Sequence, residues 1–186
     1  MRTDYNNHQN YSLEKIKSLF NPLNIEWGFS GGWALDLFIG QQSREHSDVD
    51  VGVLTQDLAV IYEKLSNEFI FYKAFDGRLQ YWLGEPLTPK YSIWVAEQEN
   101  KPFVFEIVLI ESSNEEWFYK RNNDISGSLD QLFVKGEYLY LSPEIALLYK
   151  MEASVLREKD IEDYKRVYPK LSVKQQIWLD NHCSYK

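Results

Sequence analysis

The spacing of hydrophobic residues in the N-terminal third of the chain changes repeatedly between the helical and the strand-like period. Apolar residues at 13, 16, 19 and 20 recur at helical spacing, and Ser12 before them is a suitable N-cap. Gly40 can close a short helix, since glycine is common just after a helix end. The pattern predicts, in order, a helix over 13–20, a strand over 25–30, a helix over 33–40, a strand over 47–54 and a helix over 56–69.

The middle of the chain is rich in strand-like patterns. Its apolar runs are separated by Asp-Gly, Gly-Glu-Pro and Asn-Lys-Pro breaks, and such turn residues favour antiparallel pairing of the flanking strands. Strands are expected at 69–75, 79–84, 91–97 and 102–111, followed by a loop region at 111–137.

The C-terminal part of the chain has helical patterns with recognisable start signals. Ser142 is a suitable N-cap with Pro143 at the first helical position, and Ser172 with Gln175 fits an S-x-x-Q capping box. We expect a helix from 142 towards 160, a segment over 161–169 that continues or follows it, and a last helix over 171–182.

This order of elements predicts an α+β, or mixed α/β, fold. It would contain a mixed, partly antiparallel sheet flanked by helices, followed by further helices. We expect residues 1–137 to form the core and residues 138–186 to form a C-terminal helical portion that packs on it as a single compact unit. With 186 residues, 44% of them hydrophobic, the chain can bury a sizeable core.

Net charge, apolar runs and cysteine content limit which partners and which cellular location are expected for this chain. A net charge of −8 repels polyanions and argues against general nucleic-acid binding, whereas it attracts a small cationic substrate. No apolar run approaches the ~20 residues that span a bilayer, and the polar N-terminus lacks the apolar centre of a signal peptide. Cys183 is the single cysteine, which excludes an internal disulfide. We therefore expect a cytoplasmic protein without a membrane segment.

Asp48 and Asp50 are the first candidates for chemistry. If both lie on one strand, alternation points them to the same face, roughly 7 Å apart, where their charges repel. Either solvent screens them or a cation bridges them, and a divalent ion such as Mg²⁺ prefers such oxygen ligands together with substrate phosphates.

Glu106 is a third carboxylate, in a segment whose two faces are both apolar. An unpaired buried charge costs several kcal/mol, so Glu106 needs a metal, a cation or a proton as its partner. Alone it could be a strand Glu paired with a lysine. Beside two aspartates on a neighbouring strand, metal ligation is the favoured interpretation.

Ser30 ends a predicted strand, and Gly31 and Gly32 lie between it and a short helix. Backbone N–H groups without side chains around them can approach an anion closely, and a helix N-terminus beginning at Trp33 adds a favourable dipole. A glycine pair followed closely by an Asp-x-Asp strand therefore suits a polyphosphate.

The segments FSGGWALDLFIG and REHSDVDV together resemble the polymerase-β-like nucleotidyltransferases, and most closely the branch that contains the aminoglycoside and lincosamide enzymes. The signature residues of that branch are all present: Gly31, Gly32, Trp33, Ala34, Asp36, Gly40, Arg44, His46, Asp48 and Asp50. The resemblance extends over 27–57, 103–125 and 138–165.

The resemblance implies Mg²⁺-dependent transfer of a nucleoside monophosphate, usually AMP from ATP, to a hydroxyl of a small acceptor. It implies that Asp48 and Asp50 bind two Mg²⁺ ions and that Glu106 completes the metal site or takes the hydroxyl proton. The family more often has Asp at this third position. Glu reaches one methylene further, which leaves ligand and general base as alternatives for Glu106.

The roles of the supporting residues are less specific. Arg44 could bind phosphate or lie on the surface, and Lys150, in the middle of a predicted helix, could reach the triphosphate or the base. His46 is more often a packed structural histidine at such a position, and Asp36 is expected to cap or form an ion pair locally. The predicted nucleotide-binding residues are thus Ser30, Gly31, Gly32, Arg44 and Lys150.

Three functions from different classes fit these residues. The first is an active transferase acting on a small acceptor, with aminoglycoside and lincosamide antibiotics as candidates. The second is an antitoxin-type or other protein-modifying nucleotidyltransferase. The third is an inactive nucleotide-binding module of the same fold, which loss of a carboxylate would have favoured; all three carboxylates are retained. Small-molecule transfer is the preferred hypothesis.

Overall fold

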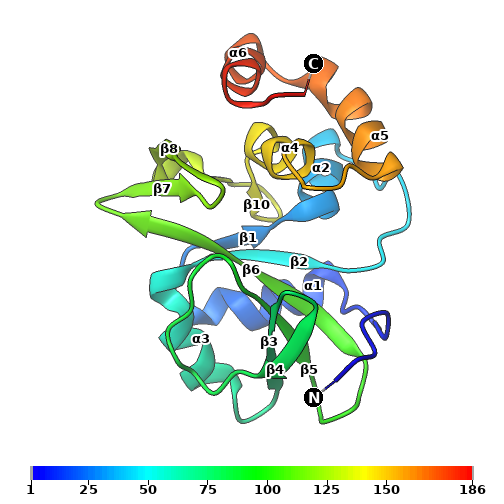
Figure 1. Cartoon of the computed structure of the whole chain (residues 1–186), viewed down its shortest axis with the longest axis vertical. Helices are drawn as coiled ribbons and strands as arrows, with labels where there is room; N and C mark the ends of the chain where they lie inside the picture. The colour runs from blue at the N-terminus through cyan, green and yellow to red at the C-terminus, as the bar shows by residue number, and fades with distance from the viewer. Residues whose placement is uncertain (1, 186) are drawn as a thin grey trace.

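A single mixed sheet runs through the molecule in the computed structural model, which describes residues 2–185 (Figure 1). The strand order is β4-β3-β5-β6-β2-β1-β10-β9, and β7 and β8 extend from β6. The strands are β1 (Trp27–Phe29), β2 (Asp50–Leu54), β3 (Ile70–Phe75), β4 (Arg78–Tyr81), β5 (Ser92–Ala96), β6 (Phe103–Ser113), β7 (Glu116–Tyr119), β8 (Asn122–Ser128), β9 (Phe133–Val134) and β10 (Tyr140–Leu141).

Six α-helices cover the two faces of this sheet. Helices α1 and α3 lie on one side, and α2, α4, α5 and α6 lie on the other (Figure 1). The helices are α1 (Leu13–Phe20), α2 (Gly31–Ile39), α3 (Leu58–Leu65), α4 (Pro143–Met151), α5 (Glu158–Val167) and α6 (Val173–His182). The predicted α+β class with a mixed, partly antiparallel sheet is confirmed.

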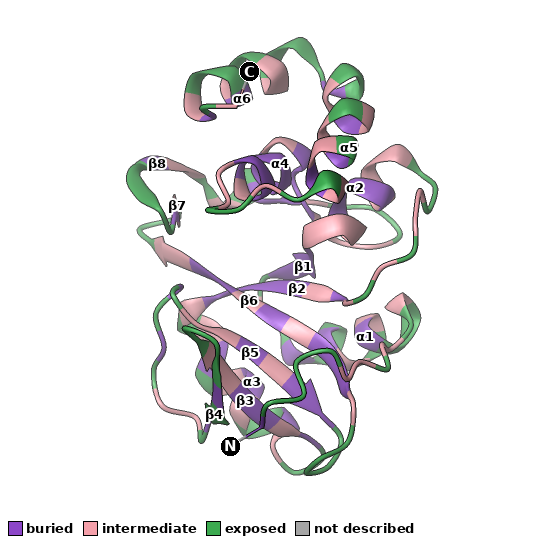
Figure 2. Cartoon of the chain, turned by 45° about the vertical axis from the view of Figure 1, so that its right-hand side comes forward, coloured by how far each residue is buried: buried purple, intermediate pink, exposed green. Residues whose placement is uncertain are grey.

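Two large hydrophobic cores hold these layers together, one on each face, and a smaller cluster of Tyr72, Leu79, Ala96 and Phe103 lies on β3 to β6. On the first face, α1 and α3 pack against alternate residues of β6, Phe105, Ile107 and Leu109, which are fully buried. On the second face, α2, α4 and α6 pack around Leu54 and Ile110 at the ends of β2 and β6. Figure 2 shows the buried segments running through β1, β2 and α4 between these layers. Burial of apolar area is the main stabilising contribution to such a fold.

Local start signals were predicted correctly at two helices. The Ser12 hydroxyl accepts a hydrogen bond from the N–H of Lys15 at 3.3 Å, which caps α1. Ser172 and Gln175 form a reciprocal capping box at α6, in which each side chain accepts from the other residue's backbone N–H. Both caps satisfy N–H groups that have no partner within the helix. The predicted antiparallel pairing is confirmed for β3 with β4, β3 with β5 and β5 with β6.

Two predictions for the second half of the chain were wrong. Residues 111–137 are not a loop, because β6 runs on to Ser113 and continues into the antiparallel pair β7 and β8, in which Trp117 and Tyr119 are buried in the second core. The helix from Pro143 ends at Met151 and α5 starts separately, because the Asp160 side chain accepts from the Arg157 N–H and begins a new helix. In residues 2–185, no helix is long and apolar enough to cross a membrane.

Candidate active site

The site lies where the N-terminal end of β2 meets β6 and the N-terminus of α2. Strands β2 and β6 are parallel, and their register places Asp50 directly beside Glu106. Side chains paired in this way project from the same face of the sheet. Both carboxylates line a cavity of about 300 Å³ that also receives Asp48.

The structure corrects the predicted position of Asp48. Strand β2 begins at Asp50 rather than at Ser47, so the two aspartates do not lie on one strand face. The first backbone hydrogen bonds of this region are those from the Ser30 N–H to the Asp50 carbonyl and from the Glu106 N–H to the Val49 carbonyl, both at 2.8 Å, whereas Asp48 lies in the preceding irregular segment. Asp48 still lines the cavity, with its carboxylate accepting from the Ser47 hydroxyl at 3.2 Å.

The pKa values of two of the three carboxylates are raised, in part because the three negative charges lie close together. Burial, followed by the charges of Asp50 and Asp48, raises the pKa of Glu106 to about 9. Burial and the charge of Asp48 raise the pKa of Asp50 to about 6, against the opposing effect of nearby cations. No lysine or arginine of residues 2–185 forms an ion pair with Glu106, which excludes the alternative of a lysine-paired strand residue. The side chain of His8 is nearby, with its Nε2 3.9 Å from the Glu106 Oε1.

The two glycines are required by the close approach of this site's own side chains. Helix α2 begins at Gly31, two residues earlier than predicted, so the pair forms its first turn. Gly31 has φ +60°, and a Cβ there would lie 2.1 Å from the Asp50 Oδ2. A Cβ on Gly32 would lie 2.5 Å from the Arg44 Nη2 and 2.6 Å from the His46 ring. With buried Ser30 as N-cap, the free N–H groups of this turn border the cavity.

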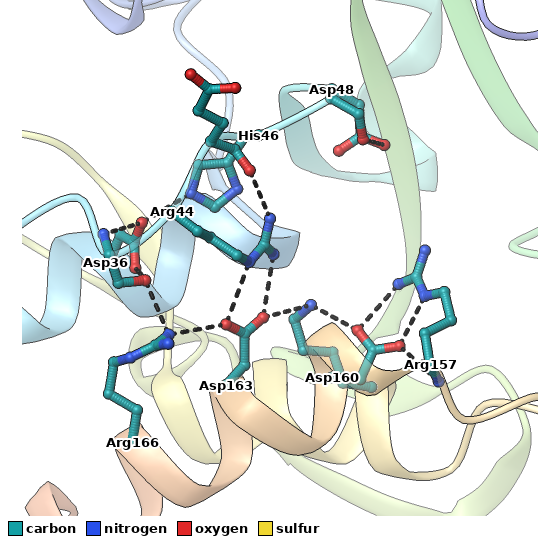
Figure 3. A network of polar contacts seen from close by, with 12 residues as sticks. Asp36, Arg44, His46, Asp48, Arg157, Asp160, Asp163 and Arg166 are labelled. Carbon is teal, nitrogen blue, oxygen red and sulfur yellow. Dashed lines mark hydrogen bonds and ion pairs between the residues drawn. The ribbon is translucent and has the colours of Figure 1, made fainter.

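Cations from α4 and α5 line the opposite side of the cavity. The Lys150 side chain is only 7% exposed, and its Nζ lies 3.0 Å from Asp160 Oδ1 and 3.1 Å from Asp163 Oδ2. Arg157 donates to Asp160 from Nε at 2.7 Å and from Nη2 at 3.0 Å. Arg44 donates to Asp163, with Nη2 at 3.1 Å from Oδ2 (Figure 3). Two buried aspartates of α5 therefore hold three cations of the cavity lining, and Asp163 also accepts from Arg166 Nη1 at 3.2 Å.

The pKa values of these aspartates follow from the same contacts. Burial alone would raise the pKa of Asp160, but hydrogen bonds from Arg157 and Lys150 outweigh it and lower the pKa to about 2. Burial likewise opposes ionisation of Asp163, yet hydrogen bonding by Arg44 and the charge of Lys150 lower its pKa. Both carboxylates are thus ionised and balance the cations, as buried charges must.

A second set of contacts fixes the segment between α2 and β2. Asp36, which is 3% exposed, accepts from His46 Nε2 at 2.7 Å and from the Ser43 N–H at 2.9 Å. The His46 ring packs on Trp33 with ring centroids 4.4 Å apart. The pKa of His46 is lowered, mainly by burial and also by the charge of Arg44. Its hydrogen bond to Asp36 acts in the opposite direction but does not outweigh them. Asp36 acts locally, as expected, but through hydrogen bonds with Ser43 and His46, and His46 is a packed, structural residue.

A family model described as aminoglycoside-2''-adenylyltransferase matches residues 12–78. The lincosamide resistance protein of Staphylococcus haemolyticus is 35% identical over 68 residues, which are 37% of this chain and 41% of that protein. The chain thus matches less than half the length of this curated relative.

Solved structures cover much more of the chain. The crystal structure of the lincosamide antibiotic adenylyltransferase LnuA with bound lincomycin has a TM-score of 0.57 and 21% identity, over 87% of this chain and 98% of LnuA. The solution structure of the antibiotic-resistance factor ANT(2'')-Ia has a TM-score of 0.56 and 15% identity, over 91% and 87% of the two chains. The fold is that of the antibiotic nucleotidyltransferases. The predicted resemblance to the aminoglycoside and lincosamide branch is confirmed.

Several residues of the candidate site were not predicted from the sequence. They line the cavity or hold its cations, and they are Arg121, Arg157, Lys159, Asp160 and Asp163. The run REKDIEDYKR has the composition of a solvated helix surface. One signal was available: Asp160 and Asp163 share with Val167 the spacing of a buried helix face, where an unpaired carboxylate would be costly.

The residues present fit a divalent cation in this nucleotidyltransferase fold. Within residues 2–185, no group of three His, Cys, Asp or Glu side chains is arranged to hold a metal ion as the structure stands. However, Asp48, Asp50 and Glu106 all line one cavity, and burial together with their mutual repulsion raises the pKa of the latter two. A bound cation would remove that repulsion, and carboxylate oxygens are the ligands that Mg²⁺ prefers.

Proposed function

We propose that this protein is an enzyme that transfers AMP from ATP to a hydroxyl of a small acceptor, with lincosamide and aminoglycoside antibiotics as the candidate acceptors. One observation carries the proposal: Asp50 and Glu106 are paired on parallel strands, directly beside a helix that starts with two glycines. Likeness to antibiotic adenylyltransferases in sequence and fold supports it.

The nucleotide would bind between the carboxylates and the cations. Its triphosphate would lie against the N–H groups of Gly31 and Gly32, where the helix dipole favours negative charge. Arg157, with a side chain 56% exposed, and Lys159 line the same cavity and can face the phosphates. Arg44 and Lys150 are held by Asp163 and add fixed positive charge behind them. Fixed charges need little reorganisation when negative charge develops during transfer.

The metal ligands in this proposal are Asp48, Asp50 and Glu106. Two bound Mg²⁺ ions would neutralise the triphosphate and favour in-line displacement at the α-phosphorus. Asp48 and Asp50 would orient the triphosphate from the side opposite the cations. Glu106 would accept the proton of the acceptor hydroxyl as its oxygen forms a bond to the α-phosphorus and the bond to pyrophosphate breaks. The products are the AMP-modified acceptor and pyrophosphate.

Both parts of the chain contribute to this site. The carboxylates and glycines belong to residues 1–137, whereas Lys150, Arg157 and Lys159 belong to residues 138–186. We therefore propose that the core and the C-terminal helical portion act as one unit. We also propose that the enzyme works in the cytoplasm, where ATP and Mg²⁺ are available.

The test is transfer of label from ATP. The protein is incubated with Mg²⁺, α-labelled ATP and either lincomycin or tobramycin, and labelled acceptor is separated from ATP. We expect a labelled acceptor with the parent protein, and none with Asp50→Asn or when EDTA replaces Mg²⁺. Lys64→Gln is the matched control, since Lys64 is exposed on α3 and pairs with Glu63 away from the cavity. Mg²⁺-dependent ATP binding without labelling of either acceptor would indicate a protein-modifying enzyme or an inactive module instead.

A further inference from the structure

A second cavity, of about 310 Å³, lies next to the first one. Glu106 lines both cavities, so its carboxylate lies at their junction. The proposed base thus faces the nucleotide on one side and a separate hollow on the other. That hollow is lined by Tyr5, Ala74, Phe75, Asp76, Gly77, Arg78, Leu79, Lys90, Tyr91, Ser92, Trp94, Glu106 and Lys120, and we call it the β3–β5 cavity.

The register of the sheet explains why a hollow forms at this place. Trp94 on β5 is directly opposite Glu106 on β6, so both side chains project from the same face. Two residues along, Ser92 of β5 is paired with Val108 of β6 and with Ala74 of β3. Small side chains at Ser92 and Ala74 leave space beside the large Trp94 ring. The floor of the β3–β5 cavity is therefore formed by the small residues Ser92 and Ala74, which lie next to the large Trp94 on the same face of the sheet.

Aromatic rings surround this floor. Phe75 and Tyr91 have ring centroids 5.1 Å apart, and Tyr5 packs edge-on against Trp94 at 6.2 Å. The Tyr5 hydroxyl donates to the Gly77 carbonyl at 2.6 Å, which ties the N-terminal segment to the turn between β3 and β4. A ring of the ligand could stack or pack edge-on here, in the way that aromatic pairs prefer.

The charges of the β3–β5 cavity are opposite to those of the whole chain. Three cations line it, Arg78, Lys90 and Lys120, whereas Asp76 is the one carboxylate besides Glu106. Lys90 Nζ lies 5.3 Å from the Phe75 ring and 5.2 Å from the Tyr91 ring, which holds positive charge at the rim. The chain as a whole carries a net charge of −8. A polycation attracted by the overall charge would thus meet local repulsion at this cavity.

We propose, on the basis of the proposed function, that the β3–β5 cavity binds the acceptor and selects a hydroxyl compound with an apolar or aromatic part and at most one positive charge. The acceptor hydroxyl would reach Glu106 at the junction of the two cavities, facing the α-phosphorus. Polycations such as aminoglycosides are excluded by Arg78, Lys90 and Lys120. Net charge alone predicted a cationic acceptor. The cations that line this cavity lead us to propose instead an acceptor with at most one positive charge.

The first experiment measures binding, so that it does not depend on turnover. The probes are phenyl β-glucoside, which is neutral, hydroxylated and aromatic, and tobramycin, which is a polycation; both are titrated into the full chain by saturation-transfer NMR. We expect the glucoside to bind and tobramycin to bind at least tenfold more weakly. Ser92→Trp, which fills the floor, should weaken glucoside binding at least tenfold.

A charge variant keeps the test valid if Ser92→Trp fails to fold. Arg78→Glu combined with Lys90→Glu, both at exposed positions, should strengthen tobramycin binding at least fivefold and leave glucoside binding within twofold. Lys64→Glu combined with Lys15→Glu is the matched control, because it makes the same charge change away from both the β3–β5 cavity and the nucleotide cavity. Tighter tobramycin than glucoside binding to the parent, or equal effects of the two double variants, would overturn the inference.

Nucleotide binding separates this inference from the proposed function. ATP with Mg²⁺ is titrated into the same variants without acceptor, and its affinity should stay within twofold of the parent in all of them. Failure of the parent to bind ATP would refute the proposed function. Normal ATP binding and transfer, with acceptor binding unaffected by the cavity variants, would refute only the location and selectivity proposed for the acceptor.

Discussion

Replacing Glu106 by Gln tests the proposed base through stability as well as activity. Burial, together with the charges of Asp50 and Asp48, raises the pKa of Glu106 to about 9, so the carboxyl keeps its proton in the ligand-free fold at neutral pH. In the unfolded chain the same group ionises near its usual pKa of 4.5. The protonated Glu106 side chain therefore contributes its full stability below pH 4.5, where it is protonated in both states. That stability is lost as the pH rises towards 9, because the unfolded chain then ionises while the folded chain keeps its proton.

The magnitude follows from the interval between the unfolded-state pKa and the working pH. One pKa unit corresponds to about 1.4 kcal/mol, so at pH 7 the retained proton lowers the free energy of unfolding by about 3 kcal/mol. Glutamine resembles the protonated carboxyl in shape and cannot ionise. Glu106→Gln is thus expected to be more stable than the parent by about 3 kcal/mol at pH 7, with no difference at pH 4 and a larger one at pH 9.

Two measurements decide the outcome. Urea unfolding at pH 4, 7 and 9 gives the stability difference, and single-turnover transfer with saturating ATP gives the chemical rate, which should fall by ~10²-fold or more when a general base is lost. ATP affinity should change less than threefold. If Glu106→Gln is less stable than the parent at pH 7 and transfers AMP normally, Glu106 is a structural partner of His8, 3.9 Å away, and the reasoning is wrong.

Three further substitutions test the surroundings of Glu106. Asp50→Asn removes a charge from the crowded carboxylates, so thermal stability should be kept or raised, while Mg²⁺-dependent transfer falls at least 100-fold on the scale of catalytic-group loss. Gly31→Ala should lower the free energy of unfolding by about 2–4 kcal/mol, because Gly31 has a positive φ and the new Cβ would clash with Asp50. Gly40→Ala is the control: Gly40 has φ +77° but no atom within 4 Å, so the cost measured by urea unfolding should be about 1 kcal/mol. Lys150→Met leaves the two buried aspartates of α5 short of a partner and should cost about 3–5 kcal/mol by the same measurement; an unchanged midpoint would show that these ion pairs are dispensable.

The fold and the carboxylates were largely predictable because their signals are local. Strand and helix periods are read over a few residues, and Asp48, Asp50 and Glu106 are unusual where they occur, since charge in an apolar strand needs an explanation. That these three residues lie close together was inferred from the resemblance and from the expected position of Glu106 on a neighbouring strand. The start of β2 was predicted wrongly, because it is defined by backbone hydrogen bonds with Ser30 and Glu106, which lie far from β2 in sequence or outside its periodic pattern.

The cation side of the site could not be predicted from the sequence. Arg44 and Lys150 were considered singly, as phosphate ligands or surface residues, whereas both are held by Asp163. That arrangement depends on how α5 packs against α4 and α2, which no local pattern contains. The β3–β5 cavity was hidden for a related reason, because it arises from the difference in size between Trp94 and Ser92 on one sheet face.

The ion pair between Arg44 and Asp163 has a consequence for how the protein is made. The two residues are 119 positions apart in the chain, so at a translation rate of about 5–20 residues per second Asp163 is added roughly 6–24 s after Arg44. Late in that interval the nascent chain contains Asp48, Asp50 and Glu106, but α5 is incomplete and Asp163, the carboxylate that holds Arg44, has not been added. A ribosome stalled before α5 therefore carries a chain with all three carboxylates and a site that is still unassembled.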